Sequence, residues 1–322
     1  MRQARQYRSK GESALDVAGA RAISVGSASE ATLATSAKGR RTLRGVIMRN
    51  LDVDTVEGFG DEWSRFDQSG VGASELAELF DAYFAVFPWA SLPEEPVGFD
   101  AGCGSGRWAR LVAPRVSALH CVDASARALD VARKNLSGFD HVSFHAASID
   151  AMPFADGSMD FGYSLGVLHH MPDTQAAIEA CVRKLKLGAP LLLYLYYAFD
   201  NRPLWFRSLW QASDVARRAV SRLPGGMRHV ASDALAASVY WPLARSARAL
   251  ERIGMNVEAL PLSAYRHRSF YVMRNDALDR FGTRLEQRFT RGQMRAMMER
   301  AGLANVTFHD GVPYWCAVGF RT

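Results

Sequence analysis

The stretch Val-Gly-Phe-Asp-Ala-Gly-Cys-Gly-Ser-Gly-Arg-Trp at residues 97–108 decides the fold. A short apolar strand predicted from Val97 to Asp100 runs into three alternating glycines, Gly102, Gly104 and Gly106, and a helix is predicted to follow them. Glycines in such a turn let the backbone bend sharply and let a ligand approach the main chain closely. The N-terminus of the following helix offers unpaired N–H groups to a negatively charged group.

A second apolar strand is predicted over residues 118–123 and ends on Asp123, 21 residues after Gly102. A carboxylate at the end of this strand is placed to accept hydrogen bonds from both ribose hydroxyls of a nucleoside. The glycine spacing is G-x-G-x-G preceded by Asp100, and not the G-x-G-x-x-G of dinucleotide binders. The order of strand, turn, helix, strand and terminal acid therefore predicts a site for a nucleoside-containing ligand.

Short apolar runs and helical stretches continue to alternate after this motif. Strands are predicted at 97–100, 118–123, 141–145, 159–165 and 190–197, and helices at 107–113, 124–135 and 174–185. This alternation is typical of an α/β fold in which helices cover both faces of a parallel sheet. The ligand is then expected at the carboxyl ends of the strands, near the point where the strand order reverses.

Changes in composition predict five segments. Residues 1–46 are rich in Ala, Ser, Gly and Arg and are predicted to be a disordered extension, with a basic arm for nucleic acid as the alternative. The other four are a helical cap at 47–96, a core at 97–197, an insertion at 198–290 and a closing helix with strands at 291–322. Within the cap, apolar spacing predicts a helix over 74–87.

Composition excludes several classes of protein. The net charge of +6 is uneven, because residues 47–197 hold 11 basic and 20 acidic side chains while residues 198–290 hold 15 Arg, no Lys and 8 acidic side chains. No apolar run reaches the roughly 20 residues of a membrane-spanning helix. The four cysteines lie far apart with no metal-ligand spacing, so neither disulfides nor a metal is expected, and we expect a cytoplasmic protein.

Several motifs resemble those of the class I S-adenosylmethionine-dependent methyltransferases, in the branch that acts on small molecules. They are FDAGCGSGR (99–107), CVDAS (121–125), SIDAMPFADGSMDFGYSLGVLHHMPD (148–173), VRKLKLGAPLLLYLY (182–196) and EQRFTRGQMRAMMERAGLANVTF (286–308). The resemblance implies a Rossmann-like, seven-stranded, mostly parallel sheet. One departure is Ser148, which stands where the family often has Asp in contact with adenine.

The resemblance also implies where S-adenosylmethionine would bind and S-adenosylhomocysteine would form. The glycine turn would hold the methionine moiety, Asp123 the ribose, residues 148–150 the adenine, and Leu165 with Gly166 would lie beside the sulfonium. Phe59 and Trp63 are candidates to close over the cofactor, although both are equally consistent with helix packing. The expected cofactor-binding residues are Phe59, Trp63, Asp100, Gly102, Cys103, Gly104, Gly106, Asp123, Ala124, Ser148, Ile149, Asp150, Leu165 and Gly166.

Methyl transfer from a sulfonium requires alignment and exclusion of water, and it requires a general base only when the acceptor is a weak acid. His169 and His170 follow the strand 159–165 and are candidates for that base, or else buttress the next helix. The insertion is predicted to form a substrate lid. Its candidate substrate-binding residues, together with one from the preceding strand, are Tyr197, Tyr265, Arg266, Arg268, Tyr271 and Arg274. Arginine forks favour an anionic acceptor, unless they pair with surface acids instead.

The sequence thus predicts an enzyme that transfers a methyl group to oxygen or nitrogen of a small, anionic acceptor in natural-product or glycan metabolism. Two alternatives remain open: an RNA methyltransferase, and a non-catalytic partner protein that binds S-adenosylmethionine. Nucleic acid is the less favoured partner, because no recognised RNA-binding module is present. The oligomeric state is not predicted.

Overall fold

The computed structural model describes residues 34–35, 41–42 and 50–322. The chain divides into two units, residues 1–47 and 48–322. In the first, the two-residue strands β1 (Ala34–Thr35) and β2 (Arg41–Thr42) pair antiparallel. The predicted disorder of residues 1–46 otherwise concerns positions outside the described residues and stays a prediction.

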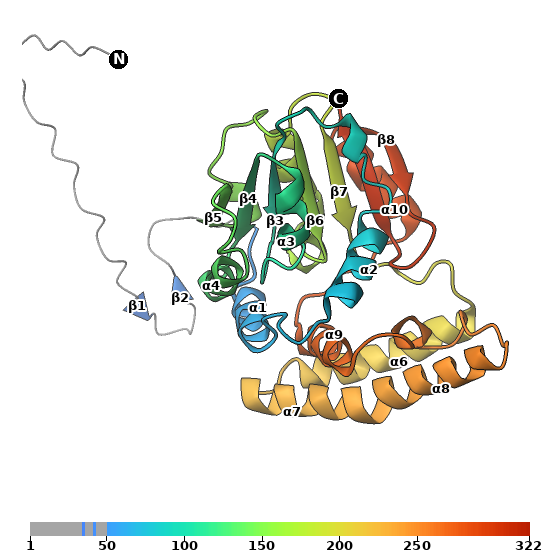
Figure 1. Ribbon diagram of the computed structural model, residues 1–322. Coiled ribbons are helices and arrows are strands. Elements are labelled where there is room, and N and C mark those ends of the chain that lie inside the picture. The colour runs from blue at the N-terminus through green and yellow to red at the C-terminus, as the bar shows by residue number, and fades with distance from the viewer. Residues whose placement is uncertain (1–33, 36–40, 43–49) are drawn as a thin grey trace, which may run out of the picture. The chain divides into compact units, whose positions relative to one another are not determined.

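The second unit is built on a seven-stranded sheet of order β5-β4-β3-β6-β7-β9-β8 (Figure 1). The five strands from β3 to β7 are parallel, and β9 pairs antiparallel with both β7 and β8. This confirms the predicted Rossmann-like, mostly parallel sheet. The strands are β3 (Val97–Ala101), β4 (Ala118–Asp123), β5 (Val142–Ala146), β6 (Phe161–Leu165), β7 (Pro190–Tyr194), β8 (Leu303–Phe308) and β9 (Cys316–Arg321).

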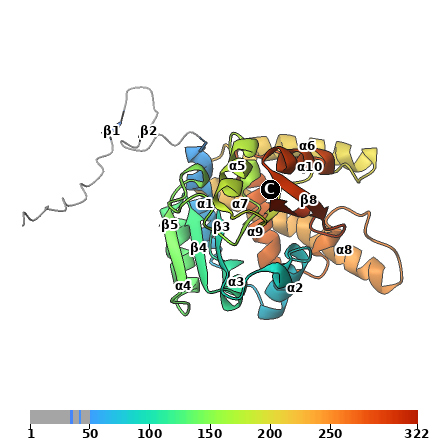
Figure 2. The ribbon, with the colours of Figure 1, turned by 90° about the horizontal axis from the view of Figure 1, so that it is seen from above.

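Helices cover both faces of this sheet, as the alternation predicts (Figure 2). On one face, α5 (Thr174–Lys184) and α10 (Arg291–Arg300) bury Ile178 and Met294 in one hydrophobic core. On the other, α2 (Ala73–Tyr83), α3 (Ala109–Val112) and α4 (Ala126–Asn135) bury Phe80 and Leu129 in a second core. Alternate residues of each strand point to opposite faces, so the sheet contributes to both cores.

Two predicted helices are shorter in the structure. Helix α3 has four residues and continues as a 3-10 turn, Ala113–Arg115, because Pro114 has no N–H with which to extend an α-helix. Helix α2 ends at Tyr83, so Phe84 and Phe87 lie beyond it. Both rings are buried and pack edge-on against Tyr163 and Phe161 of β6 respectively.

Helix α1 (Val53–Arg65) precedes α2, and its N-terminus is capped by the side chain of Asp52, which accepts from the N–H of Thr55. It packs against α4 of the core and α9 of the insertion. This contact on both sides places α1 between the sheet and the insertion.

The insertion consists of helices α6 (Leu204–Val220), α7 (Gly225–Leu235), a π-turn (Ala236–Tyr240), α8 (Trp241–Arg252) and α9 (Phe270–Gly282). Both α6 and α7 pack on α9, and Figure 1 shows α6, α7 and α8 as a layer beyond α9 and the carboxyl ends of the strands. None of the helices within the described part of the chain is long and apolar enough to cross a bilayer.

Candidate functional site

A cavity of about 630 Å³ lies between the carboxyl ends of the strands and the insertion. It is lined by the glycine turn after β3, the ends of β4, β6 and β7, helix α1, and helices α6 and α9. Strand β3 is flanked by β4 on one side and β6 on the other, so the strand order reverses here. The cavity therefore occupies the position at which doubly wound sheets bind ligands.

The glycine turn needs its glycines for conformation and for space. Gly102, Gly104 and Gly106 have φ values of +82°, +53° and +74°, which L side chains rarely adopt. A Cβ on Gly102 would lie 2.4 Å from the Val167 side chain, and one on Gly104 would lie 2.8 Å from the Trp63 indole. The turn is thus shaped to bring its backbone close to α1 and the β6 loop.

Asp123 holds this turn in place. Its Oδ2 accepts from the N–H of Gly104 at 2.9 Å, and its Oδ1 accepts from the N–H of Ser125 at 2.8 Å. Burial raises the pKa of this carboxyl, and the two backbone hydrogen bonds lower it. Asp123 also lines the cavity, as does Ala124, and each carboxylate oxygen has a further lone pair with which to accept from a ligand.

The remaining expected cofactor residues divide between the cavity wall and its support. Phe59, Trp63, Gly102, Cys103, Ser148, Ile149, Leu165 and Gly166 line the cavity. Asp150 is not at the wall, and it accepts a hydrogen bond from the Ser148 hydroxyl. Asp100, Gly104 and Gly106 also lie behind the wall. Asp100 is buried with its Oδ2 unpartnered, and burial raises its pKa to about 8.

The two adjacent histidines differ in their surroundings. His170 lines the cavity and packs edge-on against the Phe59 ring, with centroids 4.9 Å apart. His169 is fully buried away from the cavity wall, with both ring nitrogens unpartnered and its ring 3.9 Å from that of Tyr196. Only His170 has the placement of a group that meets a ligand, and His169 packs inside the protein.

The tautomer of His170 follows from its hydrogen bond. Its Nδ1 lies 2.6 Å from the carbonyl oxygen of Leu285, so Nδ1 carries the proton and donates it there. The Nε2 atom is then the unprotonated nitrogen. Burial lowers the pKa of His170, whereas the hydrogen bond to Leu285 and the nearby Glu286 carboxylate raise it. Burial has the larger effect, and the pKa falls to about 4. The imidazole is therefore neutral at pH 7.

Asp279 of α9 faces the same part of the cavity. Its Oδ1 is unpartnered and lies 3.9 Å from Nε2 of His170, while Oδ2 accepts from the Tyr196 hydroxyl. Burial raises the pKa of Asp279 to about 6. Two hydrogen-bond acceptors without partners thus converge at the cavity wall. They suit a ligand that brings a donor, such as an amine or a hydroxyl.

The structure brings only part of the expected acceptor site together. Tyr197, Tyr265 and Arg268 line the cavity, and Arg268 also pairs with Glu78. Arg266 pairs with Glu251, and Arg274 forms two hydrogen bonds to Asp233. The Tyr271 hydroxyl accepts a hydrogen bond from the backbone N–H of Gln68, in the loop after helix α1. None of these three side chains lines the cavity, because acids of neighbouring segments or the cap loop hold them elsewhere.

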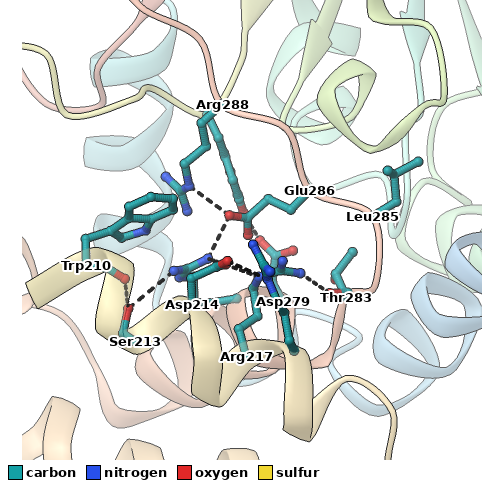
Figure 3. Close-up of polar contacts among 12 residues, drawn as sticks. Trp210, Ser213, Asp214, Arg217, Asp279, Thr283, Leu285, Glu286 and Arg288 are labelled. Atoms are coloured by element: carbon teal, nitrogen blue, oxygen red, sulfur yellow. Dashed lines mark hydrogen bonds and ion pairs between the residues drawn. The ribbon is translucent and has the colours of Figure 1, made fainter. Parts of the chain in front are cut away.

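A largely buried ion network at the cavity wall centres on Glu286, and sequence reasoning missed its members from α6, Asp214 and Arg217 (Figure 3). Oε1 of Glu286 lies 2.7 Å from both Arg280 and Arg288, and Arg217 binds Asp214 of its own helix α6 at 2.6 Å. Arg217 also donates to the carbonyl of Thr283, which ties α6 to the segment after α9. Arg280 and Arg288 line the cavity beside Trp210. No local sequence motif predicts these contacts, because they join residues from α6, α9 and the segment 283–288.

Comparison with known proteins agrees with this geometry. Residues 99–193 match the family described as a methyltransferase domain. This segment is a class I methyltransferase domain. S-adenosylmethionine is the cofactor of such domains, and the expected cofactor half of the site lies within or beside the matched residues.

Individual relatives of the methyltransferase domain overlap it over about a hundred residues. The chain is 31% identical over 104 residues to the uncharacterized methyltransferase YcgJ of Bacillus subtilis (strain 168), covering 32% of this chain and 41% of that protein. It is 30% identical over 94 residues to ubiquinone biosynthesis O-methyltransferase of Idiomarina loihiensis, covering 29% and 39%. The chain thus spans less than half the length of these relatives.

The fold also has neighbours among solved structures. A possible exported protein from Bordetella parapertussis has a TM-score of 0.50 and 14% sequence identity, with 81% of this chain and 79% of that chain covered. This likeness concerns the fold alone. The insertion and its half of the cavity lie outside the residues that the methyltransferase domain matches.

Proposed function

We propose that the protein transfers a methyl group from S-adenosylmethionine to an oxygen or nitrogen atom of a small acceptor bound in the cavity. The observation that carries the proposal is the pair of unpartnered acceptors, Nε2 of His170 and Oδ1 of Asp279, which share one cavity with the glycine turn and Asp123. One end of the cavity suits a nucleoside-containing cofactor, and the other suits an acceptor with an N–H or O–H group.

The residues at the cofactor end fit S-adenosylmethionine. The Asp123 carboxylate suits the ribose hydroxyls, and the hydroxyl of Ser105, which lines the cavity, is buried without a partner. Arg107 also lines the cavity and has no carboxylate within ion-pair distance among the described residues, which suits it to the cofactor's carboxylate. When bound, the cofactor supplies the methyl group as an electrophile on a sulfonium.

At the acceptor end, His170 would act as the general base. Its Nδ1 proton is committed to Leu285, so Nε2 is free to receive the proton that the acceptor loses as its oxygen or nitrogen bonds to the methyl carbon. The carbon–sulfur bond of the cofactor would break with its electron pair on sulfur, which would make S-adenosylhomocysteine the second product. Asp279 would hold the acceptor's donor group in line and stabilise the protonated imidazole.

The acceptor would be a small molecule. Of the three arginines expected to bind an anionic group on it, only Arg268 lines the cavity, but other arginines do. Arg202, Arg280 and Arg288 line the cavity together with Arg268, and Arg202 has no carboxylate partner among the described residues. Natural-product or glycan metabolism is the setting we propose. The four cysteines are buried free thiols, which supports a cytoplasmic location.

Calorimetric titration with S-adenosylhomocysteine tests the cofactor half. We expect micromolar binding that is lost in Asp123→Ala and kept in Asp130→Ala, which removes an exposed carboxylate of α4 that pairs with Arg133. Absence of binding to the intact protein would overturn the proposal. The candidate acceptors are amines, phenols, hydroxy acids, glycosides and RNA, each tested with S-adenosylmethionine that carries a radiolabelled methyl group. Cofactor binding without transfer of the label to any of them would favour a non-catalytic partner. Transfer of the label to RNA and to no small molecule would favour the RNA methyltransferase.

A further inference from the structure

Helix α6 buries charged side chains and exposes a stripe of apolar ones. Its polar and charged residues Ser213, Asp214 and Arg217 point inward, with Asp214 and Arg217 only 8% and 7% exposed (Figure 3). Part of its solvent side is an apolar stripe, with Leu204, Trp205 and Val215 exposed by 76%, 52% and 71%. The exposed Arg207, Gln211 and Arg218 lie along one edge of this stripe. Exposed residues at helical spacing along this side are Leu204, Trp205, Ser208, Leu209, Ala212, Val215, Ala216 and Ala219.

Helices α7 and α8 show the same feature. Met227 and Val230 of α7 are 58% and 70% exposed, and Trp241 at the start of α8 is 41% exposed. Of the 16 exposed large hydrophobic side chains among the described residues, 13 lie between Leu204 and Phe270. Such a concentration exceeds the scattered apolar residues of an ordinary surface and marks an interaction site.

The helices that carry these side chains belong to one layer. Helices α6 and α7 contact one another and both pack on α9, so the sides that they turn away from α9 face outward (Figure 1). We define the outer face of the insertion as Leu204, Trp205, Val215, Met227, Val230 and Trp241. No described segment of the chain covers these residues, as their exposure shows.

The charges around the outer face are positive. Arg207, Arg222, Arg248 and Arg252 have no carboxylate partner among the described residues; Arg248 is half-buried and the other three are exposed. The carboxylates of α6, α7 and α8 are already engaged: Asp214 by Arg217 and Arg218, Asp233 by Arg65 and Arg274, and Glu251 by Arg266 and His267. The surface therefore has cations to offer and almost no anions.

We propose that the outer face of the insertion docks on an anionic lipid surface. Helices that lie in a membrane interface combine exposed Trp, Leu and Val with arginines, and anionic headgroups attract those arginines. A second copy of the chain would bring the same unpaired arginines against each other, so charge disfavours it as the occupant. Helix α6 is held from behind by the Arg217–Thr283 hydrogen bond, and α6 and α7 both pack on α9, so docking needs no unfolding.

The cavity opens on the docking helices. Leu209 of α6 and Leu243 of α8 line the cavity and are 52% and 42% exposed, and Val239 between α7 and α8 does the same at 39%. An acceptor with an apolar portion could pass from a lipid surface to His170 along these side chains. This last step rests on the proposed function, whereas the docking itself does not.

Vesicle co-sedimentation tests the docking with the full chain and without cofactor. We expect binding to vesicles of equal parts phosphatidylcholine and phosphatidylglycerol, weak binding to phosphatidylcholine alone, and at least a tenfold loss of affinity between roughly 0.1 M and 0.5 M salt. Equal binding to both vesicles, or no binding to either, would overturn the proposal. The titration with S-adenosylhomocysteine contains no lipid, and the co-sedimentation contains no cofactor. Failure of the proposed function and failure of the proposed docking are therefore distinguishable.

Matched variants locate the contact. Trp205→Ser combined with Val230→Ser, and separately Arg207→Gln with Arg248→Gln, should each weaken vesicle binding about tenfold or more. Leu187→Ser, at a 76% exposed side chain before β7, is the control and should bind like the parent. Unchanged binding of the Trp205/Val230 variant would refute the proposed face. So would a dimer in light scattering that this variant dissociates, because a second copy would then be the occupant.

Discussion

Nε2 of His170 lies 3.9 Å from Oδ1 of Asp279, although one residue belongs to the loop after β6 and the other to helix α9 of the insertion. Each of the two atoms lacks a hydrogen-bond partner, and both residues line the cavity. The hydrogen bond from His170 Nδ1 to Leu285 sets the imidazole tautomer. The insertion therefore both supplies the carboxylate and orients the histidine.

Replacing each of the two adjacent histidines in turn distinguishes their roles. His170→Asn should lower kcat about a hundredfold or more, because a positioned general base contributes about that factor, while S-adenosylhomocysteine binds as before. His169→Phe keeps a ring against Tyr196 and should retain most of the activity. Steady-state kinetics and calorimetry on both variants check this, and equal losses of kcat would argue against a base at position 170.

The buried His170 should also make stability depend on pH. Its pKa is about 4 in the folded protein and about 6.5 when unfolded, so below pH 6.5 the unfolded chain takes up the proton first. The free energy of unfolding should therefore fall as the pH drops from about 6.5 to 4, by up to about 1.4 kcal/mol per pH unit from this group. Above pH 6.5 the contribution is fully present and constant.

Urea unfolding at several pH values in that window measures this slope. The His170→Asn variant should show a shallower loss of stability than the parent. Asp279 works in the opposite direction, because its pKa is raised to about 6 and its folded form takes up a proton first on acidification. Asp279→Asn should thus steepen the loss, and parallel slopes in all three proteins would contradict the assignment.

Gly104→Ala tests the glycine turn. The φ of +53° costs a non-glycine residue about 1–2 kcal/mol, and the added Cβ would lie 2.8 Å from the Trp63 indole. We expect S-adenosylhomocysteine affinity to fall about tenfold or more. Gly138→Ala is the control, because no atom lies within 4 Å of its Cβ and its affinity should be unchanged. Full affinity in Gly104→Ala would remove the turn from the site.

The ion network around Glu286 should contribute strongly to the stability with which α6 packs against the rest of the protein. The Glu286 side chain is 2% exposed and pairs with both Arg280 and Arg288, so Glu286→Gln removes a buried carboxylate from two largely buried guanidinium groups, of which only Arg280 has another, Asp214 at 4.0 Å. We expect a loss of about 3–5 kcal/mol in the free energy of unfolding. Arg218→Gln removes a 66% exposed partner of Asp214 and should cost under about 1 kcal/mol. Similar midpoints of denaturation for both variants would contradict this picture.

The cofactor half of the site is predictable because local rules specify it. Gly102, Gly104 and Asp123 sit in one strand-turn-helix-strand unit, so their spacing along the chain already implies their spacing in space. The structure accordingly places Gly102 and Asp123 at one cavity, with Gly104 bonded to Asp123. Their roles toward the cofactor stay a prediction until binding is measured.

The acceptor half was predicted less well. The sequence shows an arginine-rich insertion, but it does not show which arginines have acids nearby. Arg266 and Arg274 are held away from the cavity by Glu251 and Asp233, whereas Arg280 and Arg288 reach its wall. Pairing depends on how α7, α8 and α9 pack, and helix packing is not local in sequence.

The sequence by itself determined the alternation of strands and helices that builds a parallel sheet, and the glycine turn with Asp123 beside it. Hydrophobic periodicity and glycine conformation act over a few residues, so they can be read along the chain. Only the tertiary structure decided that His170 faces the cavity while His169 does not, that Asp279 meets it, and that α6 turns its apolar side outward. These outcomes depend on contacts between segments a hundred or so residues apart, whose free energies arise only when the insertion packs against the sheet.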